Sequence, residues 1–486
     1  MCPSLFRPSA VSKGEYVSTK IYAPGLIALL SAVCLTSITS AQTSWWRIYG
    51  GTDNDVGYSV QQTTDGGYIV CGSTESRGAG GADVWLIKTD AHGETLWTRT
   101  KGGSDWDEGY SVRQTGDGGC IIVGYTVSYG AGGGDVYLIK TAANGVTTWT
   151  KTFGGQLAEE GRSVQQTTDG GYVVAGLKWT YGGNDTLNVW LLKTDANGET
   201  TWTRRYGTGW DFANSVQQTT DGGYIVAGST NGASDAYLIK TKDNGDTSWT
   251  RTIGGTDIDE VNAVEQTSDG GYIITGHGAG YNNVCLVKTD SSGNTIWSKN
   301  FGGPDACGNS VHQTADGGYV VAGWVSSFGA GGSDVYLIKT NSSGDTLWTR
   351  TYGGLYEDLG TFCQQTDDGG YIVAGYTCSF GPGSPDSSNV YLIKTDSLGN
   401  VGIQEPLAWH PAKPNSFLVR PDPFTSFACV PGHETELFAL SDVTGRQVAV
   451  CKGDRIGKGL RPGVYFLSPV GMKSVGAATA IIKAAH

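Results

Sequence analysis

The stretch "TSWWRIYGG", residues 43 to 51, is half of a unit that the chain later repeats in full. A complete copy is "TDANGETTWTRRYG" (194–207), in which a tight Asn-Gly turn leads into a tryptophan-bearing strand that stops at glycine. Six complete copies follow the half copy, and they are marked by Trp97, Trp149, Trp202, Trp249, Trp297 and Trp348. The half copy decides the fold, because the last repeat lacks the part that it supplies.

A second marker, the tetrad Asp-Gly-Gly-Tyr, gives the length of the whole repeat. It occurs seven times, once as DGGC, with its aspartate at 65, 117, 169, 221, 269, 316 and 368. Each period of 47 to 52 residues holds four strand-like segments, which in the first period are 57–63, 68–72, 84–89 and 95–100. Short glycine turns join the first segment to the second and the third to the fourth. The pattern predicts a four-stranded antiparallel sheet in every repeat and almost no helix.

The inner strands of each repeat are apolar on consecutive residues, as in "YIV" and "VYLI", so both of their faces should be covered. Small antiparallel sheets that cover one another are the blades of a β-propeller, which number roughly four to eight. The last repeat, "VYLIKTDSLGNVGIQEP", has no tryptophan strand, and residues 43–51 supply it. We therefore predict an all-β, seven-bladed β-propeller over residues 42–402, closed by its N-terminal strand.

The stretch "DANGETTW" resembles the tryptophan-docking repeat of quinoprotein-like propellers, in which Asp and Gly shape the turn and Trp wedges between blades. The resemblance covers residues 43 to about 402 and implies the same architecture. The quinone-dependent dehydrogenases of that superfamily carry a vicinal cysteine pair, which has no counterpart in this sequence. We therefore expect no redox cofactor, and a redox quinoprotein is the weakest functional hypothesis.

Residues 1–41 have the features of a secretory signal peptide. Lys20 precedes the apolar run "GLIALLSAVCL" (25–35), and small residues lead to Ala41. We expect export, and no segment of the sequence predicts a membrane span. The net charge of −13 argues against a nucleic-acid or anionic-membrane partner, whose phosphates would be repelled.

After a proline-bearing linker (403–416), residues 417–486 predict a small β-sandwich. This tail resembles the C-terminal sorting domain of the type IX secretion route in "PDPF" (421–424), "LSDVTGR" (440–446) and "LRPGVYFL" (460–467). The resemblance implies that the type IX machinery carries the protein across the outer membrane, to be secreted or held at the cell surface. Cys429 with Cys451 is the one cysteine pairing that we consider worth testing, and Cys71, Cys120 and Cys285 are expected to be buried small hydrophobes.

Strand parity places the two longer loops of every repeat on one face, which is acidic and aromatic. Its candidate binding residues are Asp55, Asp107, Glu160, Asp211, Asp259, Asp358, Trp106 and Trp210. Carboxylates and aromatic rings together suit a glycan, and carboxylate oxygens also suit calcium, which stays open as a ligand. The alternative is that the aspartates only shape the turns. The lysines of the "KT" segments, on the opposite rim, are expected to form ion pairs that are worth little individually.

One position in the first strands departs from its repeat. Its seven residues are Gln61, Arg113, Gln165, Gln217, Glu265, His312 and Gln364. Because first strands surround the central channel, Arg113, Glu265 and His312 are candidate site residues near the axis. The alternative is that these three side chains form hydrogen bonds between blades.

The sequence therefore predicts an extracellular, non-catalytic binding or scaffold module whose ligand is a glycan or a protein. The alternative is a secreted glycan-active hydrolase that uses two carboxylates of the acidic face. The sequence leaves open whether the protein is an enzyme, and it contains no nucleophile elbow, HExxH motif, P-loop or dinucleotide fingerprint.

Overall fold

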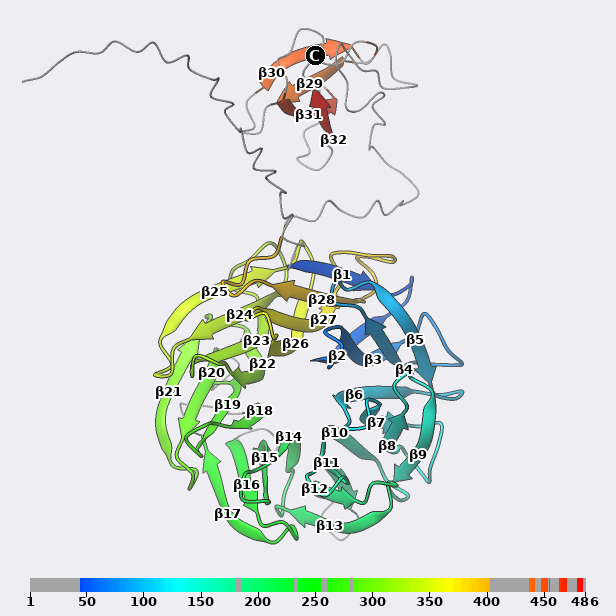
Figure 1. Cartoon of the computed structure of the whole chain (residues 1–486), viewed down its shortest axis with the longest axis vertical. Coiled ribbons are helices and arrows are strands. Elements are labelled where there is room, and N and C mark those ends of the chain that lie inside the picture. Colours follow the sequence, from blue (N-terminus) through cyan, green and yellow to red (C-terminus); the bar gives the residue numbers. More distant parts are fainter. Residues whose placement is uncertain are drawn as a thin grey trace, which may run out of the picture. The chain divides into compact units, whose positions relative to one another are not determined.

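The computed structural model describes residues 44–180, 186–230, 235–254, 260–278, 283–402, 437–441, 447–452, 454, 463–469 and 479–483. Every regular element in these ranges is a β-strand. Residues 44–402 form seven four-stranded sheets arranged in a ring, so the predicted all-β, seven-bladed propeller is confirmed (Figure 1). The predicted signal peptide (1–41) and linker (403–416) lie outside the described residues.

The strands of each blade follow one another outward from the axis (Figure 1). The first strands are β2 (Asp55–Gln62), β6 (Asp107–Gln114), β10 (Glu159–Gln166), β14 (Phe212–Gln218), β18 (Glu260–Gln266), β22 (Ala306–Gln313) and β26 (Asp358–Gln365). The second strands are β3 (Tyr68–Thr74), β7 (Cys120–Thr126), β11 (Tyr172–Thr180), β15 (Tyr224–Thr230), β19 (Tyr272–His277), β23 (Tyr319–Val325) and β27 (Tyr371–Thr377). We number the blades 1 to 7 in the order of their first strands.

The outer strands continue the same order. The third strands are β4 (Asp83–Thr89), β8 (Asp135–Thr141), β12 (Thr186–Thr194), β16 (Asp235–Thr241), β20 (Val284–Thr289), β24 (Asp334–Thr340) and β28 (Asn389–Thr395). The fourth strands are β5 (Thr95–Lys101), β9 (Thr147–Phe153), β13 (Thr200–Tyr206), β17 (Thr247–Ile253), β21 (Thr295–Phe301), β25 (Thr346–Tyr352) and, in blade 7, β1 (Trp45–Tyr49).

The N-terminal strand closes the ring as predicted. β1 pairs antiparallel with β28, from Trp45 opposite Lys394 to Tyr49 opposite Val390. Blades 7 and 1 are also joined directly, because the Asp55 amide donates to the Ser388 carbonyl at 2.9 Å. β1 thus completes the sheet formed by β26, β27 and β28. Every third strand of the described propeller is therefore paired on both sides.

A separate four-stranded antiparallel sheet lies in the C-terminal part of the chain. Its strands are β29 (Leu437–Ser441), β30 (Gln447–Lys452), β31 (Gly463–Pro469) and β32 (Thr479–Lys483), in the order β30-β29-β31-β32. The described residues of this region form this one sheet, so the β-sandwich over 417–486 stays a prediction, and Cys429 falls outside the described residues.

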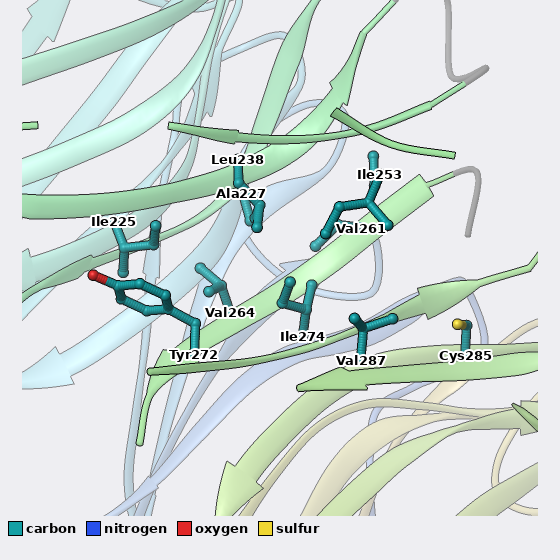
Figure 2. Close-up of a cluster of buried hydrophobic side chains, with 11 residues drawn as sticks. Ile225, Ala227, Leu238, Ile253, Val261, Val264, Tyr272, Ile274, Cys285 and Val287 are labelled. Carbon is teal, nitrogen blue, oxygen red and sulfur yellow. The ribbon is translucent and has the colours of Figure 1, made fainter. Parts of the chain in front are cut away.

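The core lies between blades, as the consecutive apolar residues predicted. Every residue of β3 and β4 is buried. Figure 2 shows the cluster between blades 4 and 5, where Ala227 and Leu238 of one sheet pack near Val261 and Ile274 of the next. Each inner sheet therefore buries apolar side chains on both of its faces. Cys71, Cys120 and Cys285 are buried, as expected.

Each tryptophan of a fourth strand docks on the next blade. A Cβ added at Gly93 would lie 2.7 Å from the ring of Trp45, so only glycine allows this contact. Gly93 also has a φ of +78°, which its turn requires. The ring of Trp45 packs edge-on against Tyr68 of blade 1, with centroids 5.7 Å apart. Because Trp45 belongs to blade 7, the interlock of tryptophan and glycine continues across the closure.

The lysines of the "KT" segments form the predicted ion pairs, but their side chains are buried. Lys88 Nζ lies 2.9 Å from Asp65 Oδ2 and donates to the Thr89 carbonyl at 2.9 Å. The lysine side chains are only 3–9% exposed in all seven blades, while the aspartates are about half exposed. Gly67 has no room for a side chain, because a Cβ there would meet the Thr89 carbonyl at 2.1 Å. The predicted ion pairs are therefore present, with the lysine end buried and the aspartate end exposed in every blade.

Candidate functional site

The carboxylates that begin the first strands lie inside the loops that they were predicted to expose. Asp55, Asp107 and Asp358 are 0% exposed and Asp211 is 1% exposed. Asp107 accepts hydrogen bonds from the Gly103 amide at 2.8 Å and from Ser128 Oγ at 2.6 Å. These aspartates therefore hold the fourth-to-first loop against the second-to-third loop of the same blade.

Blade 3 uses a different residue for this role than the sequence suggested. Glu159, not Glu160, is buried and accepts from the Gly155 amide at 3.0 Å. Glu160 is half-buried and forms an ion pair with Arg162, 3.1 Å away. Asp259 lies outside the described residues.

A second buried carboxylate meets the first at several blade junctions. A Cβ added at Gly353 would lie 2.0 Å from Asp334 Oδ1 and 2.6 Å from Asp358 Oδ2, so both side chains close on the same glycine. Asp334 Oδ1 is buried and accepts no hydrogen bond from a described residue. The pKa of Asp334 is raised overall. Burial is the main cause, the hydrogen bond from the Ala330 amide opposes it, and the neighbouring Asp358 carboxylate adds to it. The same arrangement recurs at Gly102 and Gly154.

Four side chains outside the predicted binding set lie in the first strands of blades 1 to 3. Tyr110 donates to Glu108 Oε2 at 2.5 Å, and its ring packs edge-on against Tyr58. Arg162, from the same strand position as Tyr58 and Tyr110, donates to Asn214 at 2.7 Å. The pKa of Glu108 is raised overall. Burial is the main cause, the hydrogen bond from the Tyr110 hydroxyl opposes it, and the Glu160 carboxylate adds to it. We call Tyr58, Glu108, Tyr110 and Arg162 the inner cluster.

The other blades fill this strand position with small polar side chains. Asn214, Asn262 and Asn309 each donate to a carbonyl of the next blade, at 2.9, 3.1 and 2.8 Å. Thr361 donates across the closure to the Gly57 carbonyl at 2.7 Å. An alignment of the first strands at this position would have revealed the inner cluster, because Tyr, Tyr and Arg interrupt a run of Asn and Thr.

Aromatic side chains are the exposed feature of the longer loops. Trp106 is 50% exposed and Trp210 is 49% exposed, and Tyr129, Phe328 and Tyr356 are exposed to a similar degree. Trp210 packs edge-on against Trp179, with ring centroids 5.1 Å apart. Of the side chains predicted to form the loop face, the two tryptophans are therefore exposed, whereas the described aspartates are buried.

The axial residues Arg113, Glu265 and His312 line one cavity of about 180 Å³. His312 Nδ1 lies 2.6 Å from Glu265 Oε2, and Glu265 Oε1 accepts from the Gln313 amide at 3.1 Å. Arg113 Nη1 donates to the Val112 carbonyl at 2.8 Å, and its guanidinium lies 5.0 Å from the centre of the Phe362 ring. Burial lowers the pKa of Arg113 to about 10, and Glu265 opposes this shift. Arg113 therefore stays charged at neutral pH.

Glutamines form a second ring that sequence reasoning did not single out. The Oε1 atom of the last residue of each first strand accepts a backbone amide of the preceding blade, at 2.8–2.9 Å. These residues are Gln62, Gln114, Gln166, Gln218, Gln266, Gln313 and Gln365. This ring explains why the position is glutamine in all seven blades, because a neutral acceptor must reach one amide.

Among the described residues, no group of three or more His, Cys, Asp or Glu side chains is placed to hold a metal ion. No helix of the described part of the chain is long and apolar enough to cross a membrane.

No protein-family model matches the chain, and no curated protein is significantly similar to it. Solved structures similar to it include Sqt1 from Chaetomium thermophilum, at 13% identity and a TM-score of 0.42, over 69% of this chain and 82% of that one. The Pan2 WD40 domain of Neurospora crassa has 11% identity and a TM-score of 0.45, over 75% and 98%. A structure described as a gluconolactonase has 11% identity and a TM-score of 0.36, over 72% and 92%. At these values, none of the three informs the function of this chain.

Proposed function

We propose that the protein is an extracellular, non-catalytic binding module that holds a glycan on its loop face. The observation that carries the proposal is the exposure of Trp106 and Trp210, both of which lie in fourth-to-first loops and are about half exposed. Flat aromatic rings bury the apolar face of a sugar while the surrounding polar groups bond its hydroxyls. A protein is the other ligand class that the sequence left open.

A glycan fits these rings better than a protein does. The exposed aromatic side chains are spread over several blades and stand in loops rich in Gly, Ser and Asp. A protein interface would instead favour a contiguous apolar patch with a buried centre. Separate rings at intervals suit a polymer whose sugar units repeat.

The experiment is a glycan array probed with the full chain and with Trp106→Ala/Trp210→Ala. The double variant should fold, because blade 3 carries Ala158 at the same loop position. We expect at least a tenfold loss of glycan binding. Leu347→Ala, which removes an equally exposed apolar side chain from β25, is the matched control and should bind normally. Equal binding by the double variant and the wild type would contradict the proposal.

A hydrolase is the second candidate, and the inner cluster supports it. Glu108 has a raised pKa, which suits a proton donor, and the nearby Glu160, paired with Arg162 at 3.1 Å, would be the second carboxylate. Release of reducing sugar from any glycan bound on the array, lost in Glu108→Gln and in Glu160→Gln, would establish this activity. Binding without release would support the non-catalytic module.

The route of the protein to the outside is part of the proposal. The signal-peptide features of residues 1–41 and the type IX resemblance of residues 417–486 support secretion or display at the outer surface. Localisation of the full chain in a type IX-competent host, compared with a chain that ends at residue 416, tests this route. Equal surface delivery of both chains would argue against it.

A further inference from the structure

The axial cavity is lined by amide groups whose orientation is fixed. Gln61, Gln165, Gln217 and Gln364 line it, and the Oε1 atom of each accepts the backbone amide of the following blade at 2.5–3.2 Å. Only the oxygen of a side-chain amide can accept, so the Nε2 group cannot occupy the same place. None of these four Nε2 groups donates to a described residue. The cavity therefore offers four oriented donors.

Arg113 adds a positive charge to these donors. Its guanidinium stacks on the ring of Phe362, and Nη1 donates to Val112. Stacking uses the flat face of the guanidinium and leaves the in-plane N–H groups free to bond. Nε and Nη2 have no acceptor among the described residues, and a carboxylate is the group that two parallel N–H donors fit best.

Arg113 and Phe362 come from different blades, and both depart from the repeat. Phe362 stands in blade 7, at a strand position where the other six blades carry Ser or Ala. Arg113 stands in blade 2, at a position that is glutamine in four others. Two bulky substitutions that meet inside the channel build a site that the repeated fold does not need.

The hydrogen-bond acceptors of the cavity lie together, at Glu265 and His312. Glu265 is the one carboxylate among the described residues that line the cavity, and it is tied to His312 at 2.6 Å. A carboxylate and an imidazole together bond hydroxyl groups. The cavity thus has donors and a positive charge for an anionic group, and an acceptor for hydroxyls.

We propose that the axial cavity binds a small sugar acid. Arg113 and the Nε2 groups of the four glutamines bind its carboxylate, and Glu265 and His312 bind its hydroxyls. The cavity has a volume of about 180 Å³. The site is separate from the loop-face aromatics, since neither Trp106 nor Trp210 lines it. The inference therefore stands independently of the proposed glycan binding.

The test is calorimetric titration of the full chain with glucuronate, with glucose and with sodium sulfate. We expect glucuronate to bind and to raise the melting temperature, and we expect glucose and sulfate to bind at least tenfold more weakly. Arg113→Gln restores the residue of four sister strands and should fold, as a thermal melt followed by circular dichroism would show. It should weaken glucuronate binding by ten- to a hundredfold, as the loss of a charged hydrogen-bonding partner does.

Arg205→Thr is the matched control, because it also removes one positive charge and also restores a sister residue, Thr100. It should leave glucuronate binding within about twofold of the wild type. Phe362→Ser removes the stacking partner alone and should weaken binding less than Arg113→Gln does. The proposal is wrong if glucuronate does not bind, if glucose or sulfate binds as tightly, or if Arg113→Gln keeps the wild-type affinity.

Discussion

Single residues show their role most clearly where one blade departs from its sisters. In six blades a tyrosine follows the glycine pair and packs edge-on or tilted against a tryptophan of the preceding blade, with centroids 5.6–5.9 Å apart. Blade 2 has Cys120 instead, so Trp97 packs against a small thiol. Blade 2 therefore lacks an aromatic contact that every other blade has.

The first prediction is that Cys120→Tyr stabilises the propeller. The new ring should restore the missing aromatic pair with Trp97, which is worth about 0.5–1.5 kcal/mol in free energy of unfolding. Chemical denaturation of the wild type and the variant measures the difference. The reverse change in blade 3, Tyr172→Cys, is the matched control and should destabilise; a stabilising effect there, or a loss of stability in Cys120→Tyr, would contradict this account.

At the scale of the element, β1 is the strand on which closure depends. It is the outer strand of blade 7, and its Trp45 docks on Gly93 of blade 1. Without it, β28 becomes an exposed edge strand and blade 1 loses its tryptophan. Exposed edges of apolar strands invite pairing with other chains.

We predict that a chain starting at residue 52 melts at a lower temperature than a chain starting at residue 42 and self-associates. A drop of more than 10 °C is expected, and light scattering would detect the association. A permuted chain that carries residues 43–51 after residue 402 should recover both properties, because the strand is again present. If the truncated chain stayed monomeric and melted normally, β1 would have no structural importance.

The third strands carry a second test at this scale. Asp334 faces Asp358 across Gly353, whereas Asn389 faces Asp55 across Gly50 in the equivalent place. A neutral amide does not repel the facing carboxylate as an ionised aspartate does, and the Asn389 Nδ2 group donates to the Pro382 carbonyl at 2.9 Å. Because the pKa of Asp334 is raised in the folded state, its ionisation weakens the fold as the pH rises through that pKa.

We therefore predict that Asp334→Asn stabilises the protein at pH 7, by roughly 1 kcal/mol, and has little effect near pH 3.5. Melting temperatures measured at both pH values check the prediction. Asn389→Asp makes the inverse change and should cost stability at pH 7. A benefit of Asp334→Asn that is the same at both pH values would show that the effect is not electrostatic.

At the scale of the whole molecule, the seven turn aspartates act together. In Asp117 the Lys140 ammonium and the Thr115 hydroxyl lower the pKa to about 2. In Asp169, Asp269 and Asp316 burial raises the pKa, but bonds from threonine, lysine and a glycine amide outweigh it and give about 2. Their stabilising contribution is present above the usual aspartate pKa and is lost as the pH falls toward 2.

The fourth prediction is acid unfolding between about pH 4 and pH 2. The melting temperature should fall by several degrees over this range, because all seven blades lose the same contact together. Scanning calorimetry across the range measures it. Asp316→Asn removes one of the seven and should make the fall less steep; a melting temperature that does not change between pH 4 and pH 2 would contradict the prediction.

The ring could be predicted from the sequence because repetition makes the local pattern unambiguous. The count of tryptophan strands was enough to place β1 beside β28. The site was harder to predict, because the sequence does not show whether an aspartate faces solvent or is buried against its own loop. Asp107 begins a strand and bonds backward to Gly103 and forward to Ser128, so burial follows from loop geometry that spacing does not reveal. Arg113 could be identified because it replaces a glutamine that four other first strands carry at this position. Its partner Phe362 was missed because it stands at a different position, where the other six blades carry Ser or Ala.

The closure of the ring also sets an order of events during synthesis. β1 is among the first residues of the propeller to be made, yet its partner β28 begins only at Asn389. Throughout that interval the strand has no partner strand to pair with. The final step joins the two most distant parts of the propeller, which is the kind of contact that forms slowly. A chain interrupted at any earlier point would therefore carry an unpaired strand at its beginning.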